Sequence, residues 1–388
     1  MQGRPRLLYL ITEDWYFWSH RLDLARAAQA AGFDVTVATR VTDHGERIRR
    51  EGFHLIPISL LRRSWHPLRE LRAIAELIRL YRSVRPHIVH HVALKPILYG
   101  SLAAWITRVP AVLNAFAGLG YAFTGSDRRR GLLSRAMGIG LKAAIRRSDS
   151  TVLFQNETDC AHLVARGIVS LSRTRVIPGS GVDIAEFSVK PPPQGKPIVV
   201  LPARMLWDKG VQEFVDAARR LKGEAMDARF VLVGRCDDDN PAAIAKTQLT
   251  QWMHEGVVEW WGHRDDMASV YQAATLVVLP SYREGLPKVL LEAAACGKAI
   301  VATDVPGCRD VVRHELNGLL VAPRDSDALA IAIGSLLQDP GRWKAMGAEG
   351  RKRVEQEWSA PRIVEQMLSL YWEMLERSSA EPRSHRYA

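Results

Sequence analysis

The sequence SYREGLPKVLLEAAACGKAIVATDVPG, residues 281–307, places a carboxylate inside a helix that is otherwise apolar. Pro287 suits the first turn of that helix, and the apolar residues around Glu292 leave almost no polar face. Glu284 lies in the loop before the helix, and AIVAT at 299–303 follows as a strand. A buried carboxylate is costly unless a partner pairs with it. The stretch therefore predicts an α/β unit in which Glu292 faces a partner or a ligand.

The same alternation of short apolar strands and amphipathic helices extends along the whole chain. Near-continuous apolar strands separated by helices predict an α/β fold with parallel sheets that are covered on both faces. The proline cluster KPPPQGKP at 190–197 interrupts this alternation. We therefore expect two doubly wound domains, 1–189 and 190–360, with the ligand site in the cleft at the carboxyl ends of the strands. A helix at 361–377 is expected to pack back on the first domain, and 378–388 to form a disordered tail.

The 388-residue chain carries a formal net charge of +11, which predicts an anionic ligand or partner. Charge alone leaves nucleic acid, nucleotide phosphates and an acidic membrane surface open. The four cysteines lack the paired spacing of a metal site or a disulfide framework, which favours a reducing cytosol. No apolar stretch reaches the roughly 20 residues that span a bilayer, so any membrane contact is expected to be peripheral.

Two cations follow the first strand of the second domain, in LPARMLWDKG at 201–210. Arg204 and Lys209 lie in a strand–helix turn, where a positive charge opposes the helix dipole and a bound diphosphate would relieve the conflict. Solvated surface charges are the alternative. Glu292 has two interpretations as well, an i,i+4 ion pair with Lys288 or a carboxylate that binds sugar hydroxyls.

Arg204, Lys209, the 281–307 stretch and NGLLVAP at 317–323 together resemble the donor-binding half of retaining family-4 glycosyltransferases of the GT-B fold. GSGVDIAEF at 179–187 is similar to the linker motif that leads into that half. The resemblance covers nearly the whole chain, and it implies two Rossmann-like doubly wound domains that face a central cleft.

The resemblance also implies how the donor, a nucleotide-sugar, is bound. Glu292 would bind the nucleotide ribose, and Glu284 with the backbone of Gly285 and Leu286 would bind the donor sugar. Arg204 and Lys209 would hold the diphosphate and stabilise its developing charge, and the helix beyond Pro287 offers N–H groups to phosphate. The residues expected to act in catalysis are Glu284, Arg204 and Lys209. Those expected to bind the donor are Glu292, Gly285, Leu286 and Pro287.

Asp-x-Asp in CDDDNP, residues 236–241, has two interpretations. It follows a strand and precedes a helix, so a solvated turn with a helix cap explains it as well as a metal–nucleotide site does. The resemblance favours the turn, because GT-B enzymes generally need no metal. We therefore predict no metal site.

The first domain supplies candidates for acceptor binding. Its first strand–helix turn has four aromatic residues at 15–18, which suit a membrane interface or, for two of them, the core. Many relatives have a glycine pair there, and many carry a histidine in the 114–125 loop that this chain lacks. GLGYAFT at 118–124 resembles the subgroup that adds N-acetylhexosamines to sugars on polyprenyl diphosphate. The residues expected to bind the acceptor are His20, Arg21, His90, Lys95, Gly118, Gly120 and Tyr121.

His90, His91 and Lys95 are expected at a strand end that faces the cleft, although a histidine there is often a hydrogen-bonded core residue. Residues 127–147 mix arginines and lysine with apolar residues, which predicts a basic amphipathic helix. This helix is expected to dock on an anionic membrane surface. A helix with a solvated basic face is the alternative.

The resemblance implies a hexosyltransferase that retains anomeric configuration and moves a sugar, expected to be N-acetylhexosamine, from a UDP-sugar to a polyprenyl-diphosphate-linked saccharide. The pathway would be the assembly of a bacterial surface glycan or a glycoprotein glycan, at the inner face of the plasma membrane from the cytoplasm. The donor is a substrate, and no cofactor is expected. A GT-B nucleotide-sugar epimerase and a catalytically inert nucleotide-sugar-binding partner are the alternatives. No nucleic-acid recognition motif is present, so no nucleic-acid partner is expected.

Overall fold

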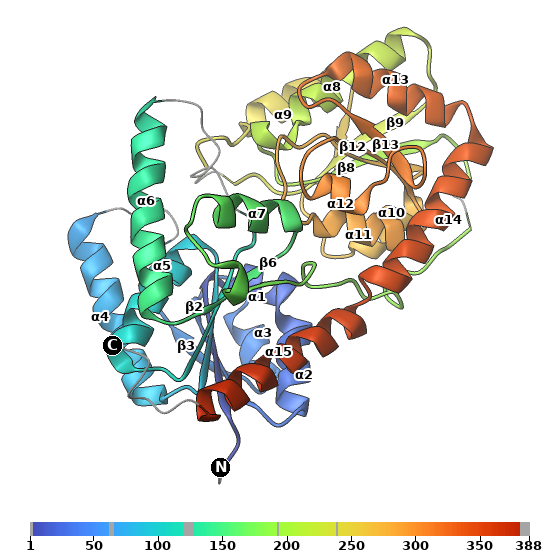
Figure 1. Ribbon diagram of the computed structural model, residues 1–388. Coiled ribbons are helices and arrows are strands. Elements are labelled where there is room, and N and C mark those ends of the chain that lie inside the picture. The colour runs from blue at the N-terminus through green and yellow to red at the C-terminus, as the bar shows by residue number, and fades with distance from the viewer. Residues whose placement is uncertain (1–2, 62–65, 119–127, 192–193, 238–239, 381–388) are drawn as a thin grey trace. The chain divides into compact units, whose positions relative to one another are not determined.

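The computed structural model describes residues 3–61, 66–118, 128–191, 194–237 and 240–380 (Figure 1). For residues 128–136 it describes the backbone alone. The chain forms two compact units. One unit comprises Met1–Ser180 and Ile363–Ala388, and the other comprises Gly181–Arg362. Each is a parallel sheet with helices on its faces, as the alternating sequence pattern predicts.

The first unit contains a seven-stranded parallel sheet in the order β3-β2-β1-β4-β5-β6-β7. Its strands are β1 (Arg6–Glu13), β2 (Asp34–Arg40), β3 (His54–Pro57), β4 (Ile88–Val92), β5 (Ala111–Ala115), β6 (Thr151–Phe154) and β7 (Thr174–Val176). Its sequence order reverses between β1 and β4, where Tyr9 of β1 lies beside His90 of β4. Such a reversal leaves a crevice at the carboxyl ends of the two strands.

Seven helices described in the first part of the chain connect these strands. They are α1 (Asp14–His20), α2 (Leu22–Ala30), α3 (Gly45–Arg50), α4 (Pro67–Val84), α5 (Leu94–Thr107), α6 (Arg128–Arg147) and α7 (Glu157–Ala165). The C-terminal helix α15 (Ala360–Ala380) packs Met367, Leu370 and Tyr371 into the same core as β1 and α2. Residues 378–380 belong to this helix, and 381–388 lie outside the described residues.

The second unit contains a six-stranded parallel sheet in the order β10-β9-β8-β11-β12-β13. Its strands are β8 (Ile198–Pro202), β9 (Arg229–Val233), β10 (Glu259–Trp260), β11 (Leu276–Leu279), β12 (Ala299–Thr303) and β13 (Gly318–Val321). Its helices are α8 (Val211–Gly223), α9 (Lys246–His254), α10 (Met267–Ala273), α11 (Lys288–Ala295), α12 (Cys308–Val311), α13 (Ser326–Leu337) and α14 (Pro340–Glu357). Here the sequence order reverses between β8 and β11.

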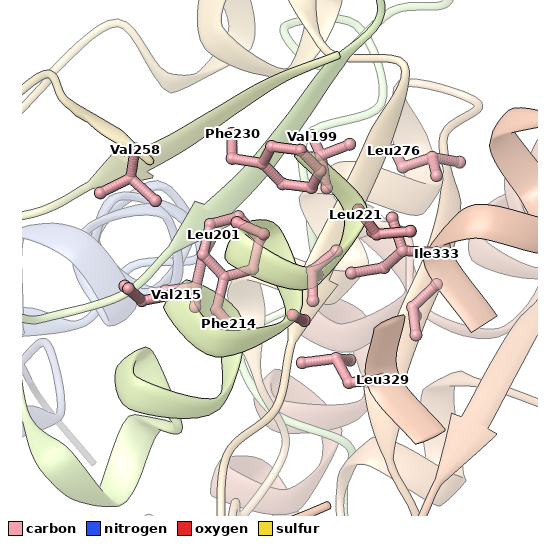
Figure 2. Packing of buried hydrophobic residues seen from close by; sticks show 14 of the residues in the cluster. Val199, Leu201, Phe214, Val215, Leu221, Phe230, Val258, Leu276, Leu329 and Ile333 are labelled. Carbon is pink, nitrogen blue, oxygen red and sulfur yellow. The ribbon is translucent and has the colours of Figure 1, made fainter. Parts of the chain in front are cut away.

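The central strands β8 and β11 of the second unit are buried on both faces, which explains why they are apolar throughout. Successive strand residues point to opposite faces of a sheet. Val199 and Leu201 of β8 pack with Phe214 of α8 in one cluster, shown in Figure 2. Val200 lies in the cluster on the other face, together with Leu290 of α11. Truncation of one such buried leucine to alanine typically costs about 2–5 kcal/mol.

The boundary between the units falls before the proline cluster at 190–197, at Ser180. Val182 and Phe187 pack into the core of the second unit, and the backbone N–H of Val182 donates to the carbonyl of Trp358. These apolar contacts assign 181–189 to the second unit, although the alternation of strands and helices in the sequence is interrupted only later, at the prolines of 190–197.

None of the helices in the described part of the chain combines the length and the apolarity that crossing a bilayer requires.

Candidate functional site

Lys209 and Glu284 meet where the strand order of the second unit reverses. Lys209 ends the 3₁₀ turn Trp207–Lys209 after β8, and Glu284 lies in the loop after β11. Since β8 and β11 are parallel neighbours, the loops that follow them leave the same edge of the sheet. Nζ of Lys209 lies 2.5 Å from Oε1 of Glu284, and both side chains are largely buried. Two residues that the sequence places 75 positions apart thus form an ion pair at the crevice typical of ligand binding.

Glycines allow the loops around this pair to approach closely. Gly210 has a φ of +70°, and a Cβ there would collide with the carbonyl oxygen of Pro280. Gly307 has a φ of +82°, and a Cβ there would collide with the carbonyl oxygen of Gly285. Only glycine tolerates both the left-handed backbone and the lack of space. The loops after β8, β11 and β12 are therefore packed backbone to backbone at this edge.

Arg204 lies in the loop after β8 and pairs with an acidic residue after β9. Its Nη1 is 2.6 Å from Oδ2 of Asp237. From the sequence, Asp237 is interpreted as part of a turn or of a metal motif. In the structure, Asp237 holds the guanidinium of Arg204 in an ion pair. Its neighbours 238–239 lie outside the described residues. Within the described part of the chain, no group of three His, Cys, Asp or Glu side chains has an arrangement that could hold a metal ion.

Glu292 is 6 % exposed and lies within α11. The hydroxyl of Tyr271 donates to its Oε2 at 2.9 Å, and Nζ of Lys288 lies 3.4 Å from its Oε1. Burial raises the pKa of Glu292, while the nearby charge of Lys288 and the hydrogen bond from Tyr271 lower it. The ion pair with Lys288 is thus present, as one of the two interpretations expects. Tyr271 was missed, since a tyrosine in the preceding helix carries no sequence signal that it reaches Glu292.

The turn before α11 has the geometry of an anion site. Pro287 is the residue that caps the helix, with an extended backbone, and no side chain caps the helix N-terminus. Leu286 is buried in the core, which leaves its backbone for any ligand contact. Uncapped N–H groups at the start of a helix and the helix dipole both favour a phosphate. The arrangement can therefore bind phosphate through cations and N–H groups, and hydroxyl groups through two carboxylates.

In the first unit, the aromatic stretch 15–18 forms helix α1 and not a loop. Phe17 is fully buried, and the other three aromatic side chains are partly buried. His20 ends the helix and stacks on Tyr16, with ring centroids 4.3 Å apart. Arg21 follows between α1 and α2 and is almost entirely buried.

His90 and His91 lie within β4 and are fully buried, which corrects the expectation that they face a cleft. Nδ1 of His90 is 2.7 Å from the hydroxyl of Tyr371. The ring of His91 lies between the hydroxyl of Tyr81, 2.8 Å from Nε2, and Oδ1 of Asn114, 2.8 Å from Nδ1. Burial lowers the pKa of both histidines, that of His91 to about 4, so both are neutral at neutral pH. They are polar core residues of the sheet.

Lys95 is also buried, in the first turn of α5. Its Nζ lies 3.0 Å from both carboxylate oxygens of Glu70 and 2.9 Å from the carbonyl oxygen of Leu61. An ammonium group has three donors, and these protein acceptors can use all of them. The geometry gives Lys95 a structural role between α5 and α4 in place of the expected contact with an acceptor.

The remaining first-unit candidates are only partly described. Gly118 has a φ of +101°, a conformation that favours glycine, while Gly120 and Tyr121 lie outside the described residues. Ala93 was also not identified from the sequence; it follows β4 as the N-terminal cap residue of α5 and has a φ of 77° and a ψ of 166°. That region is populated almost only by glycine, and such strain is typical of functional sites.

The described half of α6 is amphipathic. Leu141 and Ile145 are buried against the unit, whereas Ile139 is 72 % exposed. The guanidinium of Arg147 lies 5.3 Å from the ring centroid of Trp105 on α5. The helix therefore presents apolar and basic side chains together on the surface, as the sequence predicts.

Comparison with known proteins agrees with this architecture. Residues 6–156 match the family described as "Glycosyl transferase 4-like", and residues 196–339 match "Glycosyl transferases group 1". The chain is 28 % identical over 332 residues to the N,N'-diacetylbacillosaminyl-diphospho-undecaprenol alpha-1,3-N-acetylgalactosaminyltransferase of Campylobacter jejuni, an alignment that covers 82 % of this chain and 86 % of the relative. It is 30 % identical over 298 residues to the alpha-maltose-1-phosphate synthase of Mycolicibacterium smegmatis, covering 71 % and 76 % of the two chains.

Solved structures show the same fold. Sucrose-phosphate synthase from Thermosynechococcus elongatus superposes with a TM-score of 0.78 at 23 % identity, covering 96 % of this chain and all of that one. HepE of Anabaena, solved in complex with UDP and glucose, superposes with a TM-score of 0.75 at 18 % identity, covering 95 % and 99 %. Both matched families and the two parallel α/β units thus lead to one assignment. The chain belongs to the group 1 and 4-like glycosyltransferases and has their GT-B fold.

Proposed function

We propose that this glycosyltransferase moves an N-acetylhexosamine from a UDP-linked donor to a saccharide on polyprenyl diphosphate, with retention of anomeric configuration. The observation that carries the proposal is the Lys209–Glu284 pair at the β8–β11 reversal, with Arg204 and Glu292 on the elements beside it. The Campylobacter jejuni relative, which acts on a sugar linked to diphospho-undecaprenol and transfers N-acetylgalactosamine, supports the choice of substrates.

The donor diphosphate would bind between Arg204, Lys209 and the uncapped N-terminus of α11. Lys209 already pairs with Glu284, so an arriving diphosphate competes for the ammonium group and frees the carboxylate for sugar hydroxyls. Glu292 would accept hydrogen bonds from the ribose hydroxyls, as an acidic residue does in dinucleotide sites. HepE, which was solved with UDP and glucose, supports a UDP-linked donor.

Catalysis would be electrostatic. The bond between the anomeric carbon and the diphosphate oxygen breaks, and negative charge develops on the departing diphosphate. Arg204, Lys209 and the α11 N–H groups are preorganised to stabilise that charge, and removal of one such group typically costs about 10²–10³ in turnover. The oxygen of the acceptor hydroxyl would form the new bond to the anomeric carbon, and the departing phosphate would take the proton of that hydroxyl. This scheme requires no protein nucleophile, no metal and no cofactor.

The acceptor side would involve the membrane. Ile139 is exposed on α6, about two turns before the basic end of that helix, where the guanidinium of Arg147 lies over the ring of Trp105. An apolar residue flanked by arginine and lysine favours contact with anionic lipid at the inner face of the plasma membrane. A polyprenyl-diphosphate-linked saccharide, an intermediate of bacterial surface glycan or glycoprotein glycan assembly, would be presented there.

Calorimetric titration with UDP, GDP and ADP tests the donor site, with Glu292→Ala as the variant and Glu224→Ala as its control. Glu224 is a half-exposed residue after α8 that pairs with Arg220. We expect UDP to bind selectively, Glu292→Ala to weaken it about 10-fold or more, and the control to bind normally. Selective GDP binding would indicate a GDP-linked donor in place of a UDP-linked one. No binding of any of the three nucleotides would favour the catalytically inert partner over an enzyme.

A turnover assay then tests the reaction itself, with UDP-N-acetylhexosamine and a polyprenyl-diphosphate-linked sugar. Transfer with the α-configuration of the donor preserved is the expected result. Inversion of the anomeric centre would contradict the retaining mechanism. Formation of an epimerised UDP-sugar without transfer would favour the epimerase alternative.

A further inference from the structure

Arg21 is a buried cation that has no counter-charge among the described residues of the first unit. Its side chain is 4 % exposed. Nη1 donates to the carbonyl oxygen of His20 at 3.0 Å, while Nε is buried and has no hydrogen-bond partner among the described residues. None of the ion pairs in the described part of the chain includes Arg21. A buried charge without a partner is strongly unfavourable, so this placement calls for an explanation.

The position of Arg21 in the helices adds to the conflict. It is the N-terminal cap residue of α2, a nine-residue helix, and no side chain caps the helix there. A positive charge at a helix N-terminus opposes the helix dipole. Asp23, the acidic residue of the first turn, is exposed and points its carboxylate at Arg26 instead. The dipole and the guanidinium therefore both favour an anion, and no acidic side chain that the structure describes supplies it.

The polar side chains on which the charge of Arg21 acts, Tyr9, His90 and Tyr371, are uncharged. Tyr9, Tyr371 and His90 form a buried chain of hydrogen bonds, with the two hydroxyls 3.0 Å apart. Burial, followed by the charge of Arg21, lowers the pKa of His90 and keeps it neutral. Nε2 of His90 is buried without a hydrogen-bond partner among the described residues. These three side chains are fully buried and carry no negative charge, so they cannot neutralise Arg21.

A pocket opens beside this cation. The pocket is small. Arg21 lines it together with His20, Gly179 and Ser180 and with the apolar residues Leu24, Leu153, Ile363, Val364 and Met367, and no acidic side chain of the described residues contributes to the wall. Gly179 and Ser180 end the first stretch of this unit, and Ile363 and Val364 begin its return from the second unit. The pocket thus combines a buried guanidinium, a hydroxyl group and a helix N-terminus.

We propose that this pocket binds a phosphoryl group through the guanidinium of Arg21, the N-terminal N–H groups of α2 and the hydroxyl of Ser180. The planar guanidinium fork matches phosphate oxygens in a bidentate arrangement, and α2 contributes its dipole. The anion is the diphosphate of the polyprenyl acceptor, an identification that rests on the proposed function, in which the second unit holds the donor diphosphate.

Titration of the full chain with inorganic pyrophosphate in phosphate-free buffer tests the site. The titration uses a Lys209→Met background, which weakens the site assigned to the donor. We compare this background with Arg21→Met and with Arg26→Met, a matched control that removes an exposed arginine from the same helix. Pyrophosphate should raise the Tm of the background and of the control by several degrees at roughly 100-fold excess over Kd. It should leave the Tm of Arg21→Met unchanged.

Two further measurements test whether Arg21 binds the anion or only stabilises the fold. Without pyrophosphate, Arg21→Met should unfold no earlier than the background, because the substitution removes an unpaired buried charge. Arg21→Lys retains the charge without the fork and should bind pyrophosphate about 10-fold more weakly. Equal stabilisation of Arg21→Met, or no stabilisation of the background, overturns the proposal. If Arg21→Met does not fold, Arg21→Lys decides, and unchanged pyrophosphate affinity in that variant overturns the proposal.

Farnesyl diphosphate distinguishes the source of the anion. Tighter binding of the lipid than of pyrophosphate, dependent on Arg21, supports the acceptor headgroup. Equal affinities would overturn the lipid assignment and leave a site for free phosphate. Sugar transfer by a protein that shows no Arg21-dependent anion binding would refute only this inference, whereas Arg21-dependent binding without sugar transfer would refute only the proposed function.

Discussion

The hydroxyl of Tyr271 donates a hydrogen bond of 2.9 Å to Oε2 of Glu292, across two helices that flank strand β11. Tyr271 is fully buried, and its ring packs in the same core cluster as Leu290 and Leu291 of α11. Its hydroxyl therefore cannot turn to solvent. The contact holds one oxygen of the carboxylate, which orients Glu292 for the hydroxyl groups of a ligand.

Tyr271→Phe should weaken UDP binding about 3–10-fold, because a typical hydrogen bond to a buried charged group contributes roughly 1.5–3 kcal/mol and part of that orientation is retained through Lys288. The preference for UDP over 2′-deoxy-UDP should shrink, since Glu292 is the proposed ribose contact. Calorimetric titration of both nucleotides measures this. Tyr81→Phe is the matched control, a buried tyrosine of the first unit that bonds to His91. Equal losses for UDP and 2′-deoxy-UDP would show that Tyr271 does not act through the ribose contact.

Glu292→Gln should raise stability at neutral pH while it weakens UDP binding. Burial raises the pKa of Glu292 above its ordinary value of 4.5, so the folded protein holds a proton that the unfolded chain loses first. The stability that this group contributes is complete below pH 4.5 and falls as the pH rises through the raised pKa. In thermal unfolding, the Tm of the variant relative to that of the unmutated protein should be higher at pH 8 than at pH 5. A difference in Tm that is the same at both pH values would contradict this explanation.

Glu284→Gln should mainly lower turnover, by about 10²-fold, with little change in UDP affinity. The substitution removes the charge that pairs with Lys209, so the ammonium group remains free for the diphosphate while the donor sugar loses its carboxylate contact. Steady-state kinetics with a UDP-sugar, beside calorimetry with UDP, separates the two effects. Turnover by Glu284→Gln at the unmutated rate would remove Glu284 from the catalytic site.

Gly210→Ala should destabilise the second unit and abolish UDP binding. The new Cβ would collide with the carbonyl oxygen of Pro280, between the loops that carry Lys209 and Glu284. Gly256→Ala is the matched control, because Gly256 has nearly the same φ, +69° against +70°, but open space around its Cβ position. Backbone strain alone should cost the control about 1–2 kcal/mol, and Gly210→Ala should cost clearly more. Equal losses of Tm would mean that the close approach of the two loops is unimportant.

Much of the fold can be predicted from local patterns of apolar and polar residues. Apolar strands such as Val199–Leu201 are buried on both faces, so their alternation with helices predicts a parallel sheet from short windows of sequence. The helix around Glu292 is apolar enough to predict that this carboxylate is buried, and the structure confirms it. The proline cluster at 190–197 interrupts the alternation of strands and helices, but the units meet earlier in the chain. Val182 and Phe187 pack in the core of the second unit, so residues 181–189 belong to that unit.

Two parallel α/β units and the residue types at the edge of the second sheet can be predicted from the sequence, because the burial of strands and helices leaves periodic signals. The side-chain pairs can be known only from the folded chain: Lys209 with Glu284, Arg204 with Asp237, and Glu292 with Tyr271. It also placed His90 in the core and Lys95 on Glu70, where the sequence suggested an acceptor site. The physical reason is that strand order brings loops together from distant parts of the chain, and the separation along the sequence does not reveal which loops meet.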